Sequence, residues 1–387
     1  MRAIISGIHW KFLSAFIILI LVLLIAPSPV FADGGAPNVA YVAGAGAGIS
    51  VIDIGQRKVT SSFGVQGDPR AIYLSVDGRL LYVTQPSLNE VSILAAKTRQ
   101  VICSADVAGH PTLLALDPGP NILYAGGVDS GTVTAFDAMT CAIKFHLQVS
   151  ASVNGLAVAV VGAGIAGGTG NQVWVADSSA LNVFDSNGKR LAVIPMQEQP
   201  QYLCIPQGNT VYVTTRQGNL VAVNIATRQV SAPLLTGGYF GPMDYDAGTG
   251  EVYVPDSAHQ AVDVMTPVSV GNMPLPREPV RTIRLDAAPQ SVAITSDGQL
   301  GFVALNNGSV VMLDIPGRQI VTTIQVGGNP HFIITGLYPT LISLTPQQSV
   351  LVSILSTLLH YGGAVIIALI PIIWILRERL MKKRMRL

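Results

Sequence analysis

Seven polar side chains lie in or directly after corresponding turns of the chain and could together bind a ligand. Most follow a turn of the form Gly-x-Pro or a relic of it, such as Gly67-Asp-Pro69 or Gly328-Asn-Pro330. One is the counterpart in a repeat without the proline, and one is the histidine inside a turn. The seven residues are Arg70, Thr112, Asn154, Gln201, Gln290, His331 and His110. A guanidinium, amides, a hydroxyl and imidazoles suit hydrogen bonding and charge pairing with a ligand, provided that the fold brings them together.

An internal repeat supplies the means of bringing them together. A Tyr-Val pair or its equivalent recurs seven times, at Tyr41, Tyr82, Tyr124, Trp174, Tyr212, Tyr253 and Phe302. The copies are 41, 42, 50, 38, 41 and 49 residues apart. A period near 40 is typical of a repeat architecture in which each unit packs on its neighbours.

Each repeat contains the same series of short apolar strands and tight turns. The Tyr-Val strand is followed by a strand that ends in Asp or Asn, as in Ile49–Asp53 and Val133–Asp137. Alternating β-branched residues predict strands in both places. The terminal carboxylate or amide can accept hydrogen bonds from the next backbone N–H groups, so we interpret it as a turn cap and not as part of a catalytic or metal set. A third strand, the Gly-x-Pro turn and a fourth strand complete the unit.

The pattern predicts an all-β fold, a seven-bladed β-propeller over residues 38–337. The chain begins at the second strand of a blade, and the missing innermost strand, His331–Thr335, comes only at the far end. The first blade is therefore expected to combine one strand from the C-terminal part with three from the N-terminal part. One of the two longer repeats carries a glycine-rich loop at 161–170. The other carries a proline-rich segment at 266–280, and we expect this second segment to be an exposed contact surface.

Both ends of the chain predict delivery to a membrane. Residues 1–32 have a basic start, an apolar run and a small-x-small cleavage site, as in a secretory signal peptide. Residues 338–349 are expected to form a linker, and 350–376 are mostly apolar and contain no Asp, Glu, Lys or Arg, which predicts a transmembrane helix long enough to span a bilayer. The basic tail at 377–387 then stays in the cytoplasm. We expect a single-pass cell-membrane protein with an extracytoplasmic propeller.

Charge and cysteine content narrow the partners. Without both ends, Lys and Arg fall from 23 to 15 and Asp and Glu from 22 to 21, a net charge of about −6, so nucleic acid is not an expected partner. The chain has three cysteines, and the sequence does not decide whether Cys103 and Cys141 form a disulfide. Cys204 lies in an apolar strand and is expected to be buried.

The seven candidate residues are expected at one mouth of the central channel. The alternative is that these residues are polar only because the channel mouth is exposed to solvent, and that they bind no ligand. Loops on the same face add Asp129, Asp177, Asp256 and His259. A metal site on His110 and His331 would lack a supporting carboxylate or thiolate, so no metal or other cofactor is expected. No catalytic motif such as GxSxG or HExxH occurs.

The run from Gly67 to Thr84, with Gly-x-Pro, Asp-Gly and Tyr-Val-Thr, resembles the YVTN-type β-propeller repeat. The propeller is similar to those of quinoprotein amine dehydrogenases and bacterial lactonases. The resemblance implies an exported or surface module that binds a protein, a glycan or a small ligand. It leaves open the alternative of an enzyme, either a lactonase-like hydrolase or a redox protein, and transfers no catalytic residue.

Overall fold

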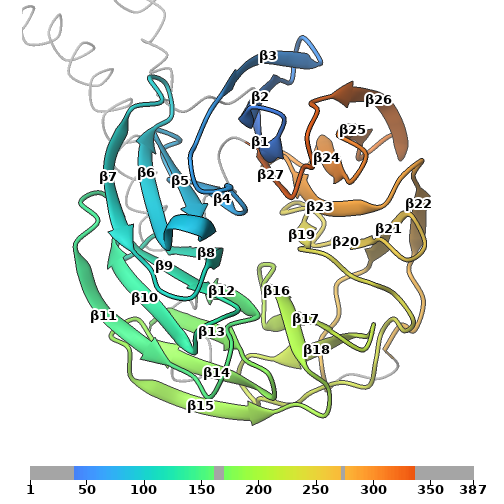
Figure 1. The fold of residues 1–387 in the computed structure, drawn as a ribbon. Helices are drawn as coiled ribbons and strands as arrows, with labels where there is room; N and C mark the ends of the chain where they lie inside the picture. Colours follow the sequence, from blue (N-terminus) through green and yellow to red (C-terminus); the bar gives the residue numbers. More distant parts are fainter. Residues whose placement is uncertain (1–38, 161–169, 272–274, 336–387) are drawn as a thin grey trace, which may run out of the picture.

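The computed structural model describes residues 39–160, 170–271 and 275–335. Seven small antiparallel sheets stand around a central axis and form a propeller (Figure 1). The predicted all-β, seven-bladed fold is confirmed.

The blades are numbered by chain order from the N-terminal end. Blade 1 has strands β27 (Phe332–Thr335), β1 (Val39–Ala45), β2 (Gly48–Asp53) and β3 (Lys58–Phe63). Blade 2 has β4 (Ile72–Leu74), β5 (Leu80–Gln85), β6 (Glu90–Ala95) and β7 (Val101–Asp106), with the short 3-10 helix η1 (Pro86–Leu88) after β5. Blade 3 has β8 (Pro111–Asp117), β9 (Ile122–Gly127), β10 (Thr132–Asp137) and β11 (Ile143–Gln148). Blade 4 has β12 (Gly155–Ala159), β13 (Gln172–Ala176), β14 (Ala180–Asp185) and β15 (Arg190–Pro195).

Blade 5 has β16 (Pro200–Cys204), β17 (Thr210–Thr215) and β18 (Leu220–Asn224). Blade 6 has β19 (Asp244–Tyr245), β20 (Val252–Asp256), β21 (Ala261–Met265) and β22 (Arg281–Arg284). Blade 7 has β23 (Pro289–Ile294), β24 (Leu300–Leu305), β25 (Ser309–Asp314) and β26 (Gln319–Gln325). The first strand given for each blade is the innermost one, so these seven strands surround the channel.

The Tyr-Val landmarks form the buried second strand of every blade. Their aromatic side chains are among the least exposed in the chain, from 0% to 3%. Each of them packs in one of the apolar clusters that include residues of two neighbouring blades, as Trp174 does with Val211 and Val223. The repeat period therefore marks contacts that hold adjacent blades together.

The ring closes as the sequence predicts. Strand β27 pairs with β1, with Ala40 opposite Thr335 and Ala43 opposite Phe332. Blade 1 thus takes its innermost strand from the C-terminal end and its other three strands from the N-terminal end. The pairing ties the two ends of the propeller together and leaves no unpaired edge at the junction.

The aspartates and the asparagine that end the strand after each Tyr-Val strand cap turns, as predicted. Asp53 Oδ1 accepts a hydrogen bond from the Gln56 N–H at 2.8 Å, and Asp314 Oδ1 accepts one from the Gly317 N–H at 2.8 Å. Asp137, Asp185 and Asn224 accept hydrogen bonds from the backbone N–H two residues on. These side chains are therefore engaged in local turns.

Two expectations about blades 5 and 6 need correction. The predicted outer strand of blade 5 is reduced to two isolated bridges, Leu220 with Leu235 and Val223 with Val230. Pro233 lies between them and lacks the N–H that a continuous ladder would use. The segment after β21 is exposed only in part: Thr266, Pro267 and Arg277 are exposed as expected, but the Val268 N–H donates to Tyr212 Oη of blade 5 at 2.8 Å, and Val270 is buried.

The expected signal peptide, linker, membrane span and tail lie outside the described residues, as does the glycine-rich loop over 161–169. Within the part of the chain that the structure describes, no helix is long and apolar enough to cross a membrane.

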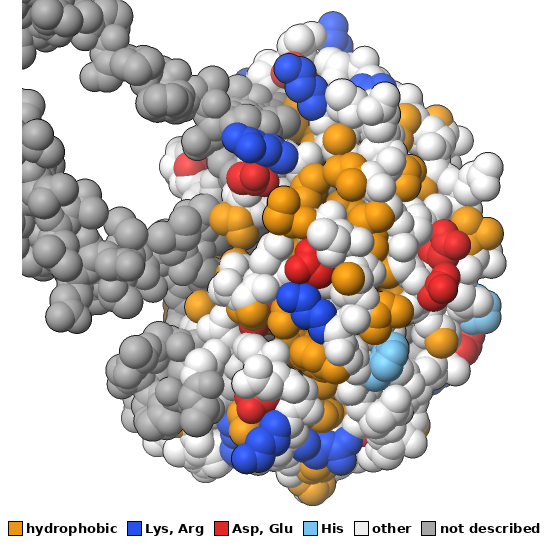
Figure 2. Space-filling view, turned by 90° about the vertical axis from the view of Figure 1, so that its left-hand side faces the viewer, with side chains coloured by type: hydrophobic (Ala, Val, Ile, Leu, Met, Phe, Trp, Pro, Cys, Tyr) orange, Lys and Arg blue, Asp and Glu red, His pale blue; other side chains and the backbone are white. Residues whose placement is uncertain are grey.

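A disulfide joins blades 2 and 3 at the outer surface. Cys103 on β7 bonds Cys141 in the turn after β10, with 6.0 Å between their Cα atoms. Exposed apolar side chains lie close by in the sequence, among them Val101, Ile102, Met139 and Ile143. Hydrophobic side chains gather across the middle of this side of the molecule (Figure 2).

Candidate functional site

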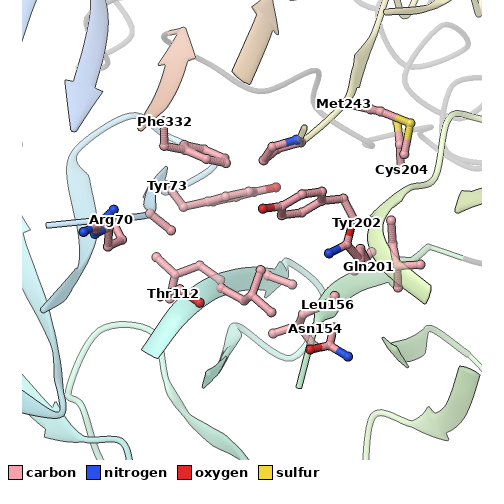
Figure 3. Close-up of a pocket in the computed structure, with 18 of the residues that line it drawn as sticks. Arg70, Tyr73, Thr112, Asn154, Leu156, Gln201, Tyr202, Cys204, Met243 and Phe332 are labelled. Atoms are coloured by element: carbon pink, nitrogen blue, oxygen red, sulfur yellow. The ribbon is translucent and has the colours of Figure 1, made fainter. Parts of the chain in front are cut away.

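A cavity of about 480 Å³ occupies the centre of the ring. All seven innermost strands, or the residues directly before them, contribute to its lining. The close-up of Figure 3 shows side chains from opposite blades pointing toward one another across this space. The volume lies within the range of small-molecule sites.

Six of the seven candidate residues line this cavity. They are Arg70, Thr112, Asn154, Gln201, Gln290 and His331. They come from six different blades and from the beginning of each innermost strand, so they surround the same mouth.

His110 is not part of the cavity lining. Its φ of 54° is left-handed, and its Nδ1 lies 2.7 Å from Asp129 Oδ2 at an exposed position. A histidine pair with His331 is therefore not formed in the cavity. The turn directs the His110 side chain to a partner outside the cavity.

The Thr of Tyr-Val-Thr fixes the strands that carry the mouth residues. Thr84 Oγ1 accepts a hydrogen bond from the Ala71 N–H at 2.8 Å, directly after Arg70. Thr214 Oγ1 accepts one from the Tyr202 N–H at 3.0 Å, directly after Gln201. The hydroxyl of the second strand thus satisfies a backbone donor that the ladder leaves free, and it holds the start of the innermost strand in place.

The mouth contains one organised cationic cluster. Arg70 Nη2 lies 2.8 Å from Asp68 Oδ2, and Arg70 Nη1 donates to His331 Nδ1 at 3.2 Å. Because a guanidinium can only donate, Nδ1 of His331 is the acceptor and its proton is on Nε2. Burial, together with the Arg70 charge, lowers the pKa of His331.

Close backbone packing holds the His331 ring. A Cβ at Gly44, whose φ is 79°, would lie 2.3 Å from the carbonyl oxygen of Asn329 and 2.6 Å from Cδ2 of His331. Only glycine allows this approach without displacement of the strand that carries the imidazole.

Below the polar mouth, the cavity wall is aromatic and apolar. Tyr73, Tyr202, Tyr245 and Phe332 line it, together with Met243 and the free thiol of Cys204. In Figure 3 the hydroxyls of Tyr73 and Tyr202 point toward one another. Burial raises the pKa of Tyr73, with Asp244 adding to the effect, and burial raises the pKa of Tyr202, so both phenols stay protonated at neutral pH.

The sequence analysis did not identify this aromatic wall. Tyr73 lies four residues after Pro69, and Tyr202 lies two residues after Pro200, both inside strands that the pattern treats as core. A signal was present, because the same strands already contribute Arg70 and Gln201 to the mouth. The prediction that Cys204 is buried is confirmed.

The other polar residues of the mouth-side loops are used within the protein. Asp177 is buried and accepts hydrogen bonds from Ser150 Oγ at 2.6 Å and Asn182 Nδ2 at 2.9 Å. Asp256 is buried and lies 2.6 Å from His259 Nδ1. Across residues 39–160, 170–271 and 275–335, no three His, Cys, Asp or Glu side chains gather closely enough to hold a metal ion.

Two histidines are expected to titrate in opposite directions from the ordinary pKa of 6.5. The Asp256 carboxylate raises the pKa of His259, chiefly through their hydrogen bond, whereas burial lowers that of His331. His259 therefore stabilises the fold below pH 6.5 and loses this contribution as pH rises through its folded pKa. His331 acts in the opposite sense, because below pH 6.5 the unfolded chain binds its proton more readily than the folded protein does.

NMR titration of the histidine side chains, assigned with His259→Gln and His331→Gln variants, measures both values. Asp256→Asn should return the pKa of His259 toward 6.5 and leave the pKa of His331 unchanged. Equal pKa values for the two histidines would contradict the contacts described above.

Comparison with solved structures shows the propeller fold. The chain is similar to Kuenenia stuttgartiensis hydrazine synthase, with a TM-score of 0.53 and 16% identity over 70% of this chain and 90% of that chain. It is similar to the β-propeller domain of Cps50 (Swd1) from Myceliophteria thermophila, with a TM-score of 0.60 and 12% identity over the same shares. It is also similar to the dihydro-heme d1 dehydrogenase NirN in complex with DHE, with a TM-score of 0.54 and 14% identity over 81% of this chain and 78% of that chain.

No protein-family model and no curated protein sequence matches the chain. At these identities, the likeness to hydrazine synthase and NirN concerns the fold, and function has to be argued from the site.

Proposed function

We propose that the protein is a membrane-anchored, extracytoplasmic propeller of the YVTN type that binds a small ligand in its central channel. The observation that carries this proposal is the convergence of six polar side chains from six blades on one cavity mouth above an aromatic wall. A protein or glycan could also contact the mouth, but a cavity of about 480 Å³ lined by all seven blades fits a small molecule better.

The disulfide supports the extracytoplasmic location. Bonds such as that between Cys103 and Cys141 persist in oxidising compartments and are rare in the cytosol. This agrees with the secretory signal peptide that the first 32 residues predict.

The direction of the terminal strands supports an orientation. Strand β27 runs from the cavity mouth beside His331 toward Thr335, and Val39 at the start of β1 lies next to this same end. Both ends of the propeller thus lie on the face opposite the mouth. An anchor that follows residue 335 would leave the mouth facing away from the bilayer.

A ligand screen with a blocked variant tests the proposal. A library of small soluble molecules would be measured by thermal shift against the full-length protein in detergent. Thr112→Trp fills the mouth, because Thr112 lines the cavity, whereas Ser87→Trp places the same bulk at an exposed position of η1, outside the cavity lining.

We expect compounds that stabilise the wild-type protein and Ser87→Trp but not Thr112→Trp. Compounds that stabilise all three proteins equally, or the absence of any stabilising compound, would contradict binding in the channel.

A further inference from the structure

We infer that the cavity takes a small organic anion, with its anionic group at Arg70 and His331 and a flat apolar body against the rings of Tyr73, Tyr202 and Phe332. This inference rests on the proposed function and specifies the chemistry of its ligand. It follows from the distribution of charge and of apolar surface around the cavity.

The charge at the mouth is positive. Of the described residues that line the cavity, Arg70 alone has a permanently charged side chain. Its counter-ion Asp68 does not line the cavity and is about half exposed, with 55% of its side chain accessible. Because solvent screens the charge of Asp68, this carboxylate neutralises Arg70 only in part, and an anion in the cavity would still be attracted to the Arg70 guanidinium.

The cluster also leaves hydrogen-bond donors for a ligand. Arg70 uses Nε and Nη2 on Asp68 and Nη1 on His331, which engages three of the five N–H groups of a guanidinium. The remaining N–H groups of Arg70 and the Nε2–H of His331 can donate hydrogen bonds but cannot accept them, so they favour a ligand that carries acceptors. Asp68 and His331 hold the guanidinium at a fixed position, so its donors are preorganised for a carboxylate or phosphate.

The rest of the wall fits an apolar body. Tyr73, Tyr202 and Phe332 present ring surface, and Leu114, Leu156 and Met243 are among the apolar residues that line the cavity beside them. The two tyrosine rings extend into the space from opposite blades, with Phe332 above Tyr73 in Figure 3. A flat apolar body gains burial along the faces of these rings, and aromatic contacts add to that gain.

The test uses sodium 2-naphthoate as the probe and 2-naphthamide as its neutral counterpart of the same shape. Binding to the full-length protein in detergent would be measured by isothermal titration calorimetry. We expect one naphthoate per chain and at least about tenfold weaker binding of the amide, because a charge-assisted hydrogen bond is lost. A third arm with 2-naphthyl phosphate distinguishes a phosphate ligand from a carboxylate.

Arg70→Gln should weaken naphthoate binding about 10- to 100-fold while it leaves the amide unaffected. Arg216→Gln is the matched control, since Arg216 is an exposed arginine outside the cavity lining. Equal binding of acid and amide by the wild-type protein would overturn the inference even if Arg70→Gln did not fold. Equal losses in Arg70→Gln and Arg216→Gln would also overturn it.

The two proposals fail in different ways. If neutral compounds bind the wild-type protein but not Thr112→Trp, while naphthoate and naphthyl phosphate do not bind, the channel is a ligand site and the anionic ligand is wrong. If no compound of any charge depends on the open mouth, the proposed function itself is wrong.

Discussion

Replacement of both Cys103 and Cys141 by alanine is expected to lower the free energy of unfolding by about 4 kcal/mol. The bond closes a loop of 38 residues and connects blades 2 and 3. In the chain-entropy account, the crosslink restricts the unfolded chain, so its loss gives the unfolded state more freedom. Chemical denaturation of the full-length protein with and without the substitutions measures the difference.

A reductant provides the control for this prediction. Treatment of the wild-type protein with dithiothreitol should reproduce the loss, and the double variant should not respond to it. If reduction leaves the unfolding of the wild-type protein unchanged, the bond does not form in the protein, and the support that it lends to an oxidising compartment is removed.

Trp174→Ala is expected to cost about 3–5 kcal/mol, the range for truncation of a large buried aromatic side chain. Trp174 is fully buried on β13 and packs with residues of blades 4 and 5. The Arg228 guanidinium of blade 5 also lies over its ring, 4.9 Å from the centroid. The substitution therefore opens a cavity and removes a cation–π contact at the same blade junction.

Two further variants control this result. Trp174→Tyr introduces the residue that most other blades carry at this place and should cost much less. Leu191→Ala removes an apolar side chain that is 37% exposed and should change stability by less than about 1 kcal/mol. A Trp174→Ala variant as stable as Leu191→Ala would contradict the role of the Tyr-Val landmarks in holding neighbouring blades together.

The period of the repeat made most of the fold predictable. One aromatic residue per repeat must be buried between blades, so Tyr82, Trp174 and Phe302 recur at the spacing of the blades. The closing strand was predictable because His331–Thr335 had no partner within its own repeat. The loss of the outer strand in blade 5 was not foreseen, because a single proline interrupts a strand of only a few residues.

The candidate site was predictable in its rim and not in its interior. Turn chemistry marks where an innermost strand begins, and this located Arg70, Gln201 and His331 at the mouth. Whether Tyr202 faces the cavity or a neighbouring blade depends on the irregular pairing of β16 with β17 between Pro200 and Leu203, which alternation in the sequence does not specify. The turn pattern also predicts His110 at the mouth. Its left-handed φ, which the pattern does not specify, directs the side chain toward Asp129 instead.

The most direct test of the account is the structure of the protein with the strongest compound from the screen bound. The account predicts that the compound lies in the central cavity, in contact with Arg70 at the mouth and with Tyr202 along the wall. A compound found on the outer surface of the blades, or on the face from which the chain ends emerge, would contradict the claim that the channel is the ligand site.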